Sequence, residues 1–146
     1  MGKECRVWVV FANERKCNHT RCLLTKGFVS WVDSYGFEVG DVVYLFMSNS
    51  RNIRFKTIVE ACGIPREDSE FWVEKAPRDL TSRLKLIGES NNNLLKEENL
   101  KRHGFNGGRS LQRPIYKNKQ LIAYINGSLK FEITAKRLYA ASQRVL

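Results

Sequence analysis

The chain alternates short hydrophobic runs with polar turns rich in Asn, Ser and Gly. Residues 6–11, 42–47 and 53–61 are rich in β-branched and aromatic side chains, which are typical of strands. The first two runs are almost wholly apolar. The third begins with alternating apolar and polar positions, as a strand with one wet face does. Turn-forming residues separate the second and third runs, and we expect all three to be neighbours in one sheet.

The rest of the pattern is more mixed. Residues 70–74 and 83–88 are each predicted to form a short strand, and residues 27–32 an irregular aromatic segment. Four helices are predicted, at 18–26, 94–103, 119–126 and 134–145, and capping residues and glycines bound the first two. This order predicts an α+β protein, a pseudobarrel of about five to six strands with helices at its edges. No linker interrupts the chain, so we expect a single domain over residues 1–146, with a basic C-terminal segment from about residue 127.

Positive charge is concentrated in the last third of the chain. Lys and Arg total 25 against 15 Asp and Glu, a net charge of +10. Residues 1–100 contain 15 basic and 14 acidic side chains, whereas residues 101–146 contain 10 basic side chains and a single acidic one, Glu132. This distribution is typical of a polyanion binder, and we expect Arg109, Arg113 and Lys117 to contact a nucleic-acid backbone. The alternative is a basic tail that only keeps the chain soluble.

The sequence lacks the signals that are typical of several classes of protein. There is no apolar run long enough to span a bilayer and no secretion signal, so we expect a cytoplasmic protein without a membrane partner. The glycine-rich phosphate loops, G-x-S-x-G and H-E-x-x-H are all missing, and we predict a protein that is not an enzyme. Residues 17–22 hold three possible zinc ligands, but no second pair follows at metal spacing. We expect neither a metal nor a cofactor.

Aromatic side chains crowd the segment that follows the first predicted helix. Phe28, Trp31, Tyr35 and Phe37 lie there beside small polar residues such as Ser30. Such a group can form a stacking pocket for a planar base, with about 1–3 kcal/mol for each stacked base. The alternative is a loop that folds its aromatic rings into the edge of the core.

The order of these segments resembles that of an EVE domain. The resemblance rests on the first strand ending in Asn13, the aromatic segment ending in Trp31, the G-D-x-V sequence at residues 40–43, and the strand over residues 55–61. It is strongest over residues 5–75 and continues to about residue 108. The EVE family belongs to the PUA-like superfold and is related to YTH and ASCH domains, so the resemblance implies a PUA-like pseudobarrel.

The resemblance also implies a reader of modified bases. In EVE and YTH relatives a flipped base enters a pocket with aromatic walls, and polar groups read its edge. By position, Trp31 is expected to be one wall, with Phe28 and Trp72 as candidates for the others. Asn13 is expected to hydrogen-bond the base edge, with Ser30 as a helper.

The favoured hypothesis is a module that recognises a modified base in DNA, 5-methylcytosine or a relative, together with a restriction nuclease or its motor subunit. An RNA-binding PUA/YTH-like reader of a methylated base is one alternative. Another is an ASCH-like hydrolase of modified nucleosides, which requires a Lys and a carboxylate in the same pocket.

Overall fold

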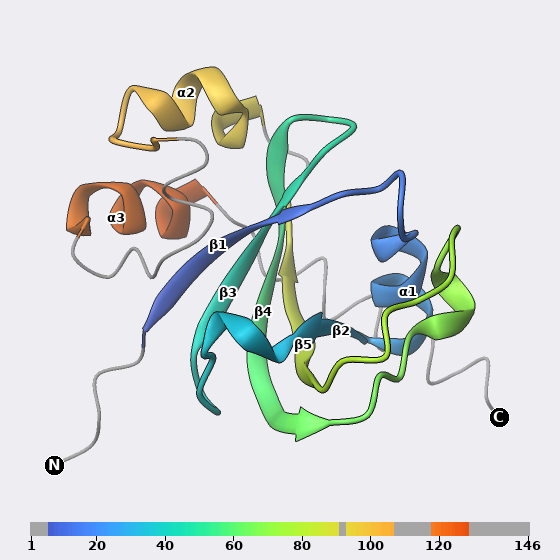
Figure 1. Cartoon of the computed structure of the whole chain (residues 1–146). Coiled ribbons are helices and arrows are strands. Elements are labelled where there is room, and N and C mark those ends of the chain that lie inside the picture. The colour runs from blue at the N-terminus through green and yellow to red at the C-terminus, as the bar shows by residue number, and fades with distance from the viewer. Residues whose placement is uncertain (1–5, 91–92, 107–117, 129–146) are drawn as a thin grey trace, which may run out of the picture.

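The computed structural model describes residues 6–90, 93–106 and 118–128 (Figure 1). Its strands are β1 (Val7–Ala12), β2 (Phe28–Val32), β3 (Val42–Met47), β4 (Asn52–Ile64) and β5 (Thr81–Glu89). The α-helices are α1 (His19–Lys26), α2 (Glu97–Lys101) and α3 (Lys119–Ser128), and the 3-10 helices are η1 (Asp33–Tyr35), η2 (Ser69–Phe71) and η3 (Asn93–Leu95). None of the helices within these residues is long and apolar enough to cross a membrane.

The five strands form one curled, mixed sheet in the order β1-β3-β4-β5-β2. The β1–β3 pair is parallel, and the other three pairs are antiparallel. The sheet bends into a half-barrel, so that β1 and β2, at the two ends of the strand order, both lie on the near side in Figure 1. The predicted α+β pseudobarrel is confirmed, as is the adjacency of the first three predicted strands.

Two hydrophobic cores lie on opposite faces of this sheet. Alternate residues of β1 and β3, such as Val10 and Leu45, point into the concave core inside the half-barrel. Residues between them, such as Val9 and Phe46, pack with α2 and α3 in a second core on the outer face. Because both faces are covered, β1 and β3 are continuous apolar runs with little alternation.

Local signals explain where α1 begins and ends. The Oδ1 atom of Asn18 accepts a hydrogen bond from the backbone N–H of Arg21, at 3.1 Å, and caps the first turn. Gly27 has a φ of 79° and donates its N–H to the carbonyl of Leu23, which ends the helix. The helix predicted over residues 18–26 is therefore confirmed.

The G-D pair of the G-D-x-V sequence has a structural role. Asp41 is buried and accepts hydrogen bonds from the guanidinium of Arg6, the indole N–H of Trp8 and the backbone N–H of Glu38. Gly40 before it has a φ of 94°, a conformation that favours glycine. The pair thus fixes the beginning of β3 against β1.

Two predicted elements are wrong. Residues 28–32 form the regular strand β2, which pairs with β5 along its whole length. Residues 70–74 do not form a strand, because η2 turns the chain there. The backbone N–H groups of Phe71 and Trp72 donate to the carbonyls of Asp68 and Ser69 and close the turn.

The later helix predictions have mixed outcomes. The helix α2 is shorter than the predicted helix over 94–103, and η3 precedes it. The helix predicted over 134–145 lies outside the described residues.

Candidate base-binding pocket

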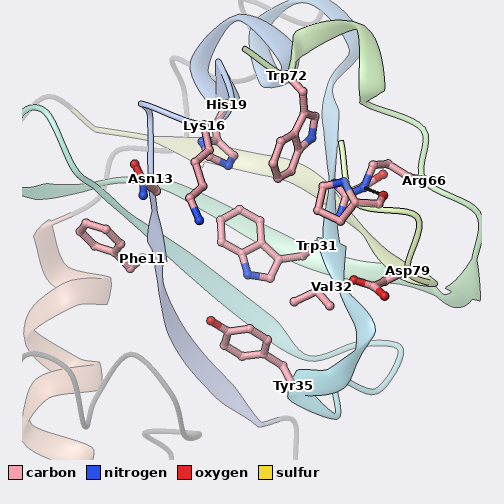
Figure 2. A pocket seen from close by; sticks show the side chains of 12 residues that line it. Phe11, Asn13, Lys16, His19, Trp31, Val32, Tyr35, Arg66, Trp72 and Asp79 are labelled. Atoms are coloured by element: carbon pink, nitrogen blue, oxygen red, sulfur yellow. Dashed lines mark hydrogen bonds between the residues drawn. The ribbon is translucent and has the colours of Figure 1, made fainter. Parts of the chain in front are cut away.

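A pocket opens beside the end of β1, where β2 and the segment after β4 approach it (Figure 2). Its volume is about 290 Å³, at the small end of the range for ligand pockets, about 300–1,000 Å³. This size suits one planar ring system. Its lining combines aromatic and aliphatic walls with a few polar groups, as small-molecule sites do.

Four of the five residues predicted to contact a base line this pocket: Asn13, Ser30, Trp31 and Trp72. They come from the end of β1, from β2 and from the segment after η2, and only the fold brings them together. Phe28 is not among the lining residues; its ring lies near the cations of Lys26 and Arg83, with Nζ and Cζ at 6.0 and 5.5 Å from the ring centroid. Arg109, Arg113 and Lys117 lie outside the described residues.

Trp31 forms a rigid wall. Its side chain belongs to the concave core and is only 7% exposed. The imidazole ring of His19 packs against it, with 5.2 Å between ring centroids and 38° between the ring planes. Because Trp31 serves both the core and the pocket, its position is fixed by packing before any ligand arrives.

Trp72 provides a second aromatic ring, and it is half-buried. Its indole N–H donates to Oδ1 of Asp68 at 3.1 Å. The guanidinium carbon of Arg66 lies 4.8 Å from the ring centroid, a cation–π contact. The backbone of Trp72 also forms an isolated antiparallel bridge with Cys17. These contacts hold Trp72 at the pocket although it lies outside the sheet.

Asp68 connects three residues of the pocket wall through hydrogen bonds. Its carboxylate is fully buried and accepts hydrogen bonds from the guanidinium of Arg66 at 2.9 Å, the backbone N–H of Ser30 at 3.2 Å, and Trp72. Sequence reasoning missed Asp68, because nothing in the acidic stretch of residues 67–70 distinguishes a buried carboxylate from a surface one. The only signal is its position two residues after Arg66 and four before Trp72.

Asn13, Ser30 and Lys16 are three of the polar residues that line the pocket. The Oδ1 atom of Asn13 accepts a hydrogen bond from the backbone N–H of Arg15 at 3.1 Å, while its amide NH₂ group has no hydrogen-bond partner in the described part of the chain. The Ser30 hydroxyl accepts the backbone N–H of Glu67 at 2.9 Å, which ties β2 to the chain after β4. Lys16 is exposed and extends toward the ring of Trp31 (Figure 2).

His19 is a pocket residue that carries no charge at neutral pH. Its side chain is 6% exposed, and its Nδ1 atom is buried without a hydrogen-bond partner among the described residues. Burial, and secondarily the positive charge of Arg66, lower the pKa of His19 to about 4. Its neighbours Cys17 and Cys22 are buried thiols, and burial raises the pKa of Cys17 to about 12. Across residues 6–90, 93–106 and 118–128, no group of three His, Cys, Asp or Glu side chains is placed to hold a metal ion.

Comparisons with known proteins identify the fold. No protein-family model and no curated protein matches the sequence. A hypothetical protein from Leishmania major has a similar structure, with a TM-score of 0.55, 16% identity and 98% of each chain covered. A protein from Agrobacterium tumefaciens gives a TM-score of 0.52 with 14% identity, over 86% of this chain and 94% of that one.

A third similar structure is that of the Pho92 YTH domain in complex with m6A. Its TM-score is 0.51, with 16% identity over 88% of this chain and 85% of the YTH domain. At these identities the comparisons show the fold alone, which is similar to that of a YTH domain. Membership of the EVE family stays a prediction.

Proposed function

We propose that this protein is a nucleic-acid-binding module that takes one modified base, flipped out of its strand, into the pocket beside Trp31 and Trp72. The observation that carries the proposal is the meeting of these two rings, from distant parts of the chain, at a cavity of single-base size. No chemical step is part of the proposal. The fold of an m6A-bound YTH domain supports it.

The energetics of base flipping require such a pocket. Taking a base out of a stack costs a few kcal/mol, and stacking on an aromatic side chain returns about 1–3 kcal/mol per base. Hydrogen bonds to the base edge must supply the remainder and the selectivity. The amide of Asn13 can provide both a donor and an acceptor, and its NH₂ group is available at the pocket.

The finer proposal concerns the base and its polymer. We infer that the base carries a methyl group, and we keep a 5-methylcytosine-type base in DNA, read for a restriction system, as the first hypothesis. Methylated adenine in RNA is the second, because the Pho92 YTH domain of similar fold has m6A bound. The two make opposite predictions for one binding panel.

The test is a titration at fixed salt with matched oligonucleotides. The panel pairs cytosine with 5-methylcytosine in DNA, and adenine with N6-methyladenine in both RNA and DNA. We expect one modified member to bind more tightly than its unmodified partner. Equal affinity for both members of every pair would overturn the proposal.

Trp72→Ala connects this preference to the pocket. Removing the ring should weaken binding of the preferred oligonucleotide by about 1–3 kcal/mol, tenfold to a hundredfold, while the half-buried position lets the fold survive. Trp72→Phe should recover part of the loss. Phe28→Ala is the matched control, since it removes another half-buried ring that does not line the pocket. Parent-like binding by Trp72→Ala would remove Trp72 from the proposed site.

A second candidate function is hydrolysis of a modified nucleoside. One observation favours it: Lys16 and Asp79, a possible amine and carboxylate pair, both line the pocket, and both are exposed. Incubation of the protein with modified nucleosides, followed by mass spectrometry, separates the two functions. A reader leaves the nucleosides intact, whereas a hydrolase forms a product that Lys16→Met no longer makes.

A further inference from the structure

A second cavity adjoins the base-binding pocket on the side of β1. It has a volume of about 260 Å³ and shares two lining residues, Phe11 and Asn13, with the first pocket. The other lining residues come from the turn after β1 and the β3–β4 turn: Arg15, Ser48, Asn49 and Arg51. Five of the six lining residues are therefore polar, and two of these are arginines.

Arg51 is held in one orientation. Its Nε and Nη2 atoms donate to the two carboxylate oxygens of Glu97, at 3.3 and 2.7 Å. Its guanidinium carbon lies 5.8 Å from the ring centroid of Phe11 and 5.1 Å from that of Phe46. A guanidinium has five N–H donors in a fixed fork, so the pairing with Glu97 leaves several of them for an anion. Rigid forks of this kind suit phosphate better than an ammonium does.

Arg15 supplies a positive charge at the second cavity. Its guanidinium is exposed and has no ion pair within residues 6–90, 93–106 and 118–128. Glu14 does not line the cavity, and its carboxylate accepts hydrogen bonds from two residues that do, the backbone N–H of Asn49 at 2.7 Å and the Ser48 hydroxyl at 3.5 Å. The positive charge of Arg15 is therefore available at the second cavity.

We propose that the second cavity binds the phosphate group next to the flipped base, with Arg15 and Arg51 as its ligands. This inference rests on the proposed function. Phe11 and Asn13 line both cavities, so in this proposal a nucleotide with its base beside Trp31 has an adjacent phosphate beyond Asn13. The cavity thus selects a base that is joined to a sugar-phosphate chain over a free base or nucleoside, and it fixes the direction in which the strand crosses the pocket.

The test compares probes that differ only in phosphate. N6-methyladenosine and 5-methyl-2′-deoxycytidine are each titrated as the nucleoside, the 5′-monophosphate, the 3′-monophosphate and the central residue of a trinucleotide. For the base that the pocket accepts, the trinucleotide and one monophosphate should bind about tenfold more tightly than the nucleoside, or better, as expected for hydrogen bonds to a charged group.

Two variants test whether the phosphate is bound by Arg15 and Arg51 in the second cavity. Arg15→Gln should remove most of the gain from phosphate and leave the affinity for the nucleoside unchanged. It should also reduce the slope of log affinity against log salt by about 0.7 for a single strand. Arg51→Lys keeps the charge but loses the fork, and should remove part of the gain. Lys119→Gln is the control, because Lys119 is an exposed cation that lines neither cavity.

The outcomes distinguish this site from the proposed function. A nucleoside that binds, with no gain from phosphate or with a gain that Arg15→Gln retains, overturns the phosphate site alone. If neither nucleoside nor either trinucleotide binds, the proposed function fails and the phosphate site falls with it. Thermal melting of Arg51→Lys shows whether the variant keeps the stability of the parent, and Arg15→Gln, at an exposed position, tests the site independently of folding.

Discussion

At the scale of single residues, the pocket depends on polar groups whose burial costs free energy. His19 is placed between the core and the cavity, where its ring packs on Trp31 and its Nδ1 atom has no hydrogen-bond partner among the described residues. A protonated imidazole there would be buried near the positive charge of Arg66. The neutral form is therefore strongly favoured, and the ring acts as an apolar support for Trp31.

This placement predicts a pH-dependent stability. The folded pKa of His19, about 4, lies below the value of about 6.5 for an unfolded chain. As the pH falls, the unfolded state therefore takes up the proton first, and stability is lost between these two values. When the pH falls from about 7.5 to about 5, the free energy of unfolding should decrease by about 2 kcal/mol because of His19.

Urea denaturation of the parent and of His19→Gln, at both pH values, measures this contribution. The variant should lose less stability than the parent over the interval, since glutamine does not titrate while every other titratable group is unchanged. Equal losses in the two proteins would show that His19 has an ordinary pKa.

At the scale of elements, whether a strand can be recognised in the sequence depends on how its two faces are buried. β1 and β3 are continuous apolar runs because both of their faces are covered, and this signal is visible in the sequence. β2 is a short edge strand of mixed aromatic and polar residues, so the sequence signal resembles that of a loop. Residues 70–74 have the composition of a strand, but η2 and the hydrogen bonds of Asp68 turn the chain there.

Asp68 is therefore the residue on which the segment from Arg66 to Trp72 depends. Asp68→Asn should leave the Arg66 guanidinium, whose side chain is 7% exposed, without its counter-charge. Removing one partner of a buried ion pair costs about 3–5 kcal/mol, which thermal melting detects. The indole N–H signal of Trp72 in NMR spectra should shift or broaden, because its acceptor is weakened.

A double variant separates stability from the position of Trp72. Asp68→Leu combined with Arg66→Met replaces the ion pair by apolar groups, a change that is often neutral for stability. The backbone N–H of Ser30 also loses its acceptor, which costs about 1–3 kcal/mol, so we expect melting between that of Asp68→Asn and that of the parent. Binding of the modified oligonucleotide should be weak, because Trp72 has lost its hydrogen-bond acceptor and its cation–π contact with Arg66. If the double variant binds like the parent, Asp68 contributes to folding only.

At the scale of the whole molecule, the candidate site combines residues that sequence analysis can and cannot find. Trp31 and Asn13 follow from the family resemblance, in which Asn13 comes directly after the first predicted strand and Trp31 ends the aromatic segment. Lys16, Arg66 and Asp68 could not be predicted, because they are brought to the pocket only when β1 and β2 curl toward each other and the chain after β4 crosses behind them. Their contributions are long-range contacts, which spacing along the chain does not encode.

The charge distribution leads to a final prediction about nucleic-acid affinity. The first 100 residues are nearly neutral, whereas residues 101–146 hold 10 of the 25 basic side chains with one acidic residue. If this third of the chain binds the backbone, reversing Arg109, Arg113 and Lys117 to Glu removes up to three phosphate contacts. The slope of log affinity against log salt should then flatten by up to about 2.7 for duplex DNA, since each contact contributes about 0.9.

The matched control reverses Arg21, Lys26 and Lys85, three basic residues that line neither cavity. It changes the net charge equally. It disturbs surface ion pairs, which contribute about 0–1 kcal/mol each, and the cation–π contacts of Arg21 and Lys26 with the rings of Phe71 and Phe28. If the basic third contacts only the backbone, its triple variant should weaken binding of modified and unmodified oligonucleotides by the same factor and preserve the preference between them. An unchanged slope in that variant, or an equal flattening in the control, would show that the backbone is bound elsewhere, with the arginines of the second cavity as the next residues to reverse.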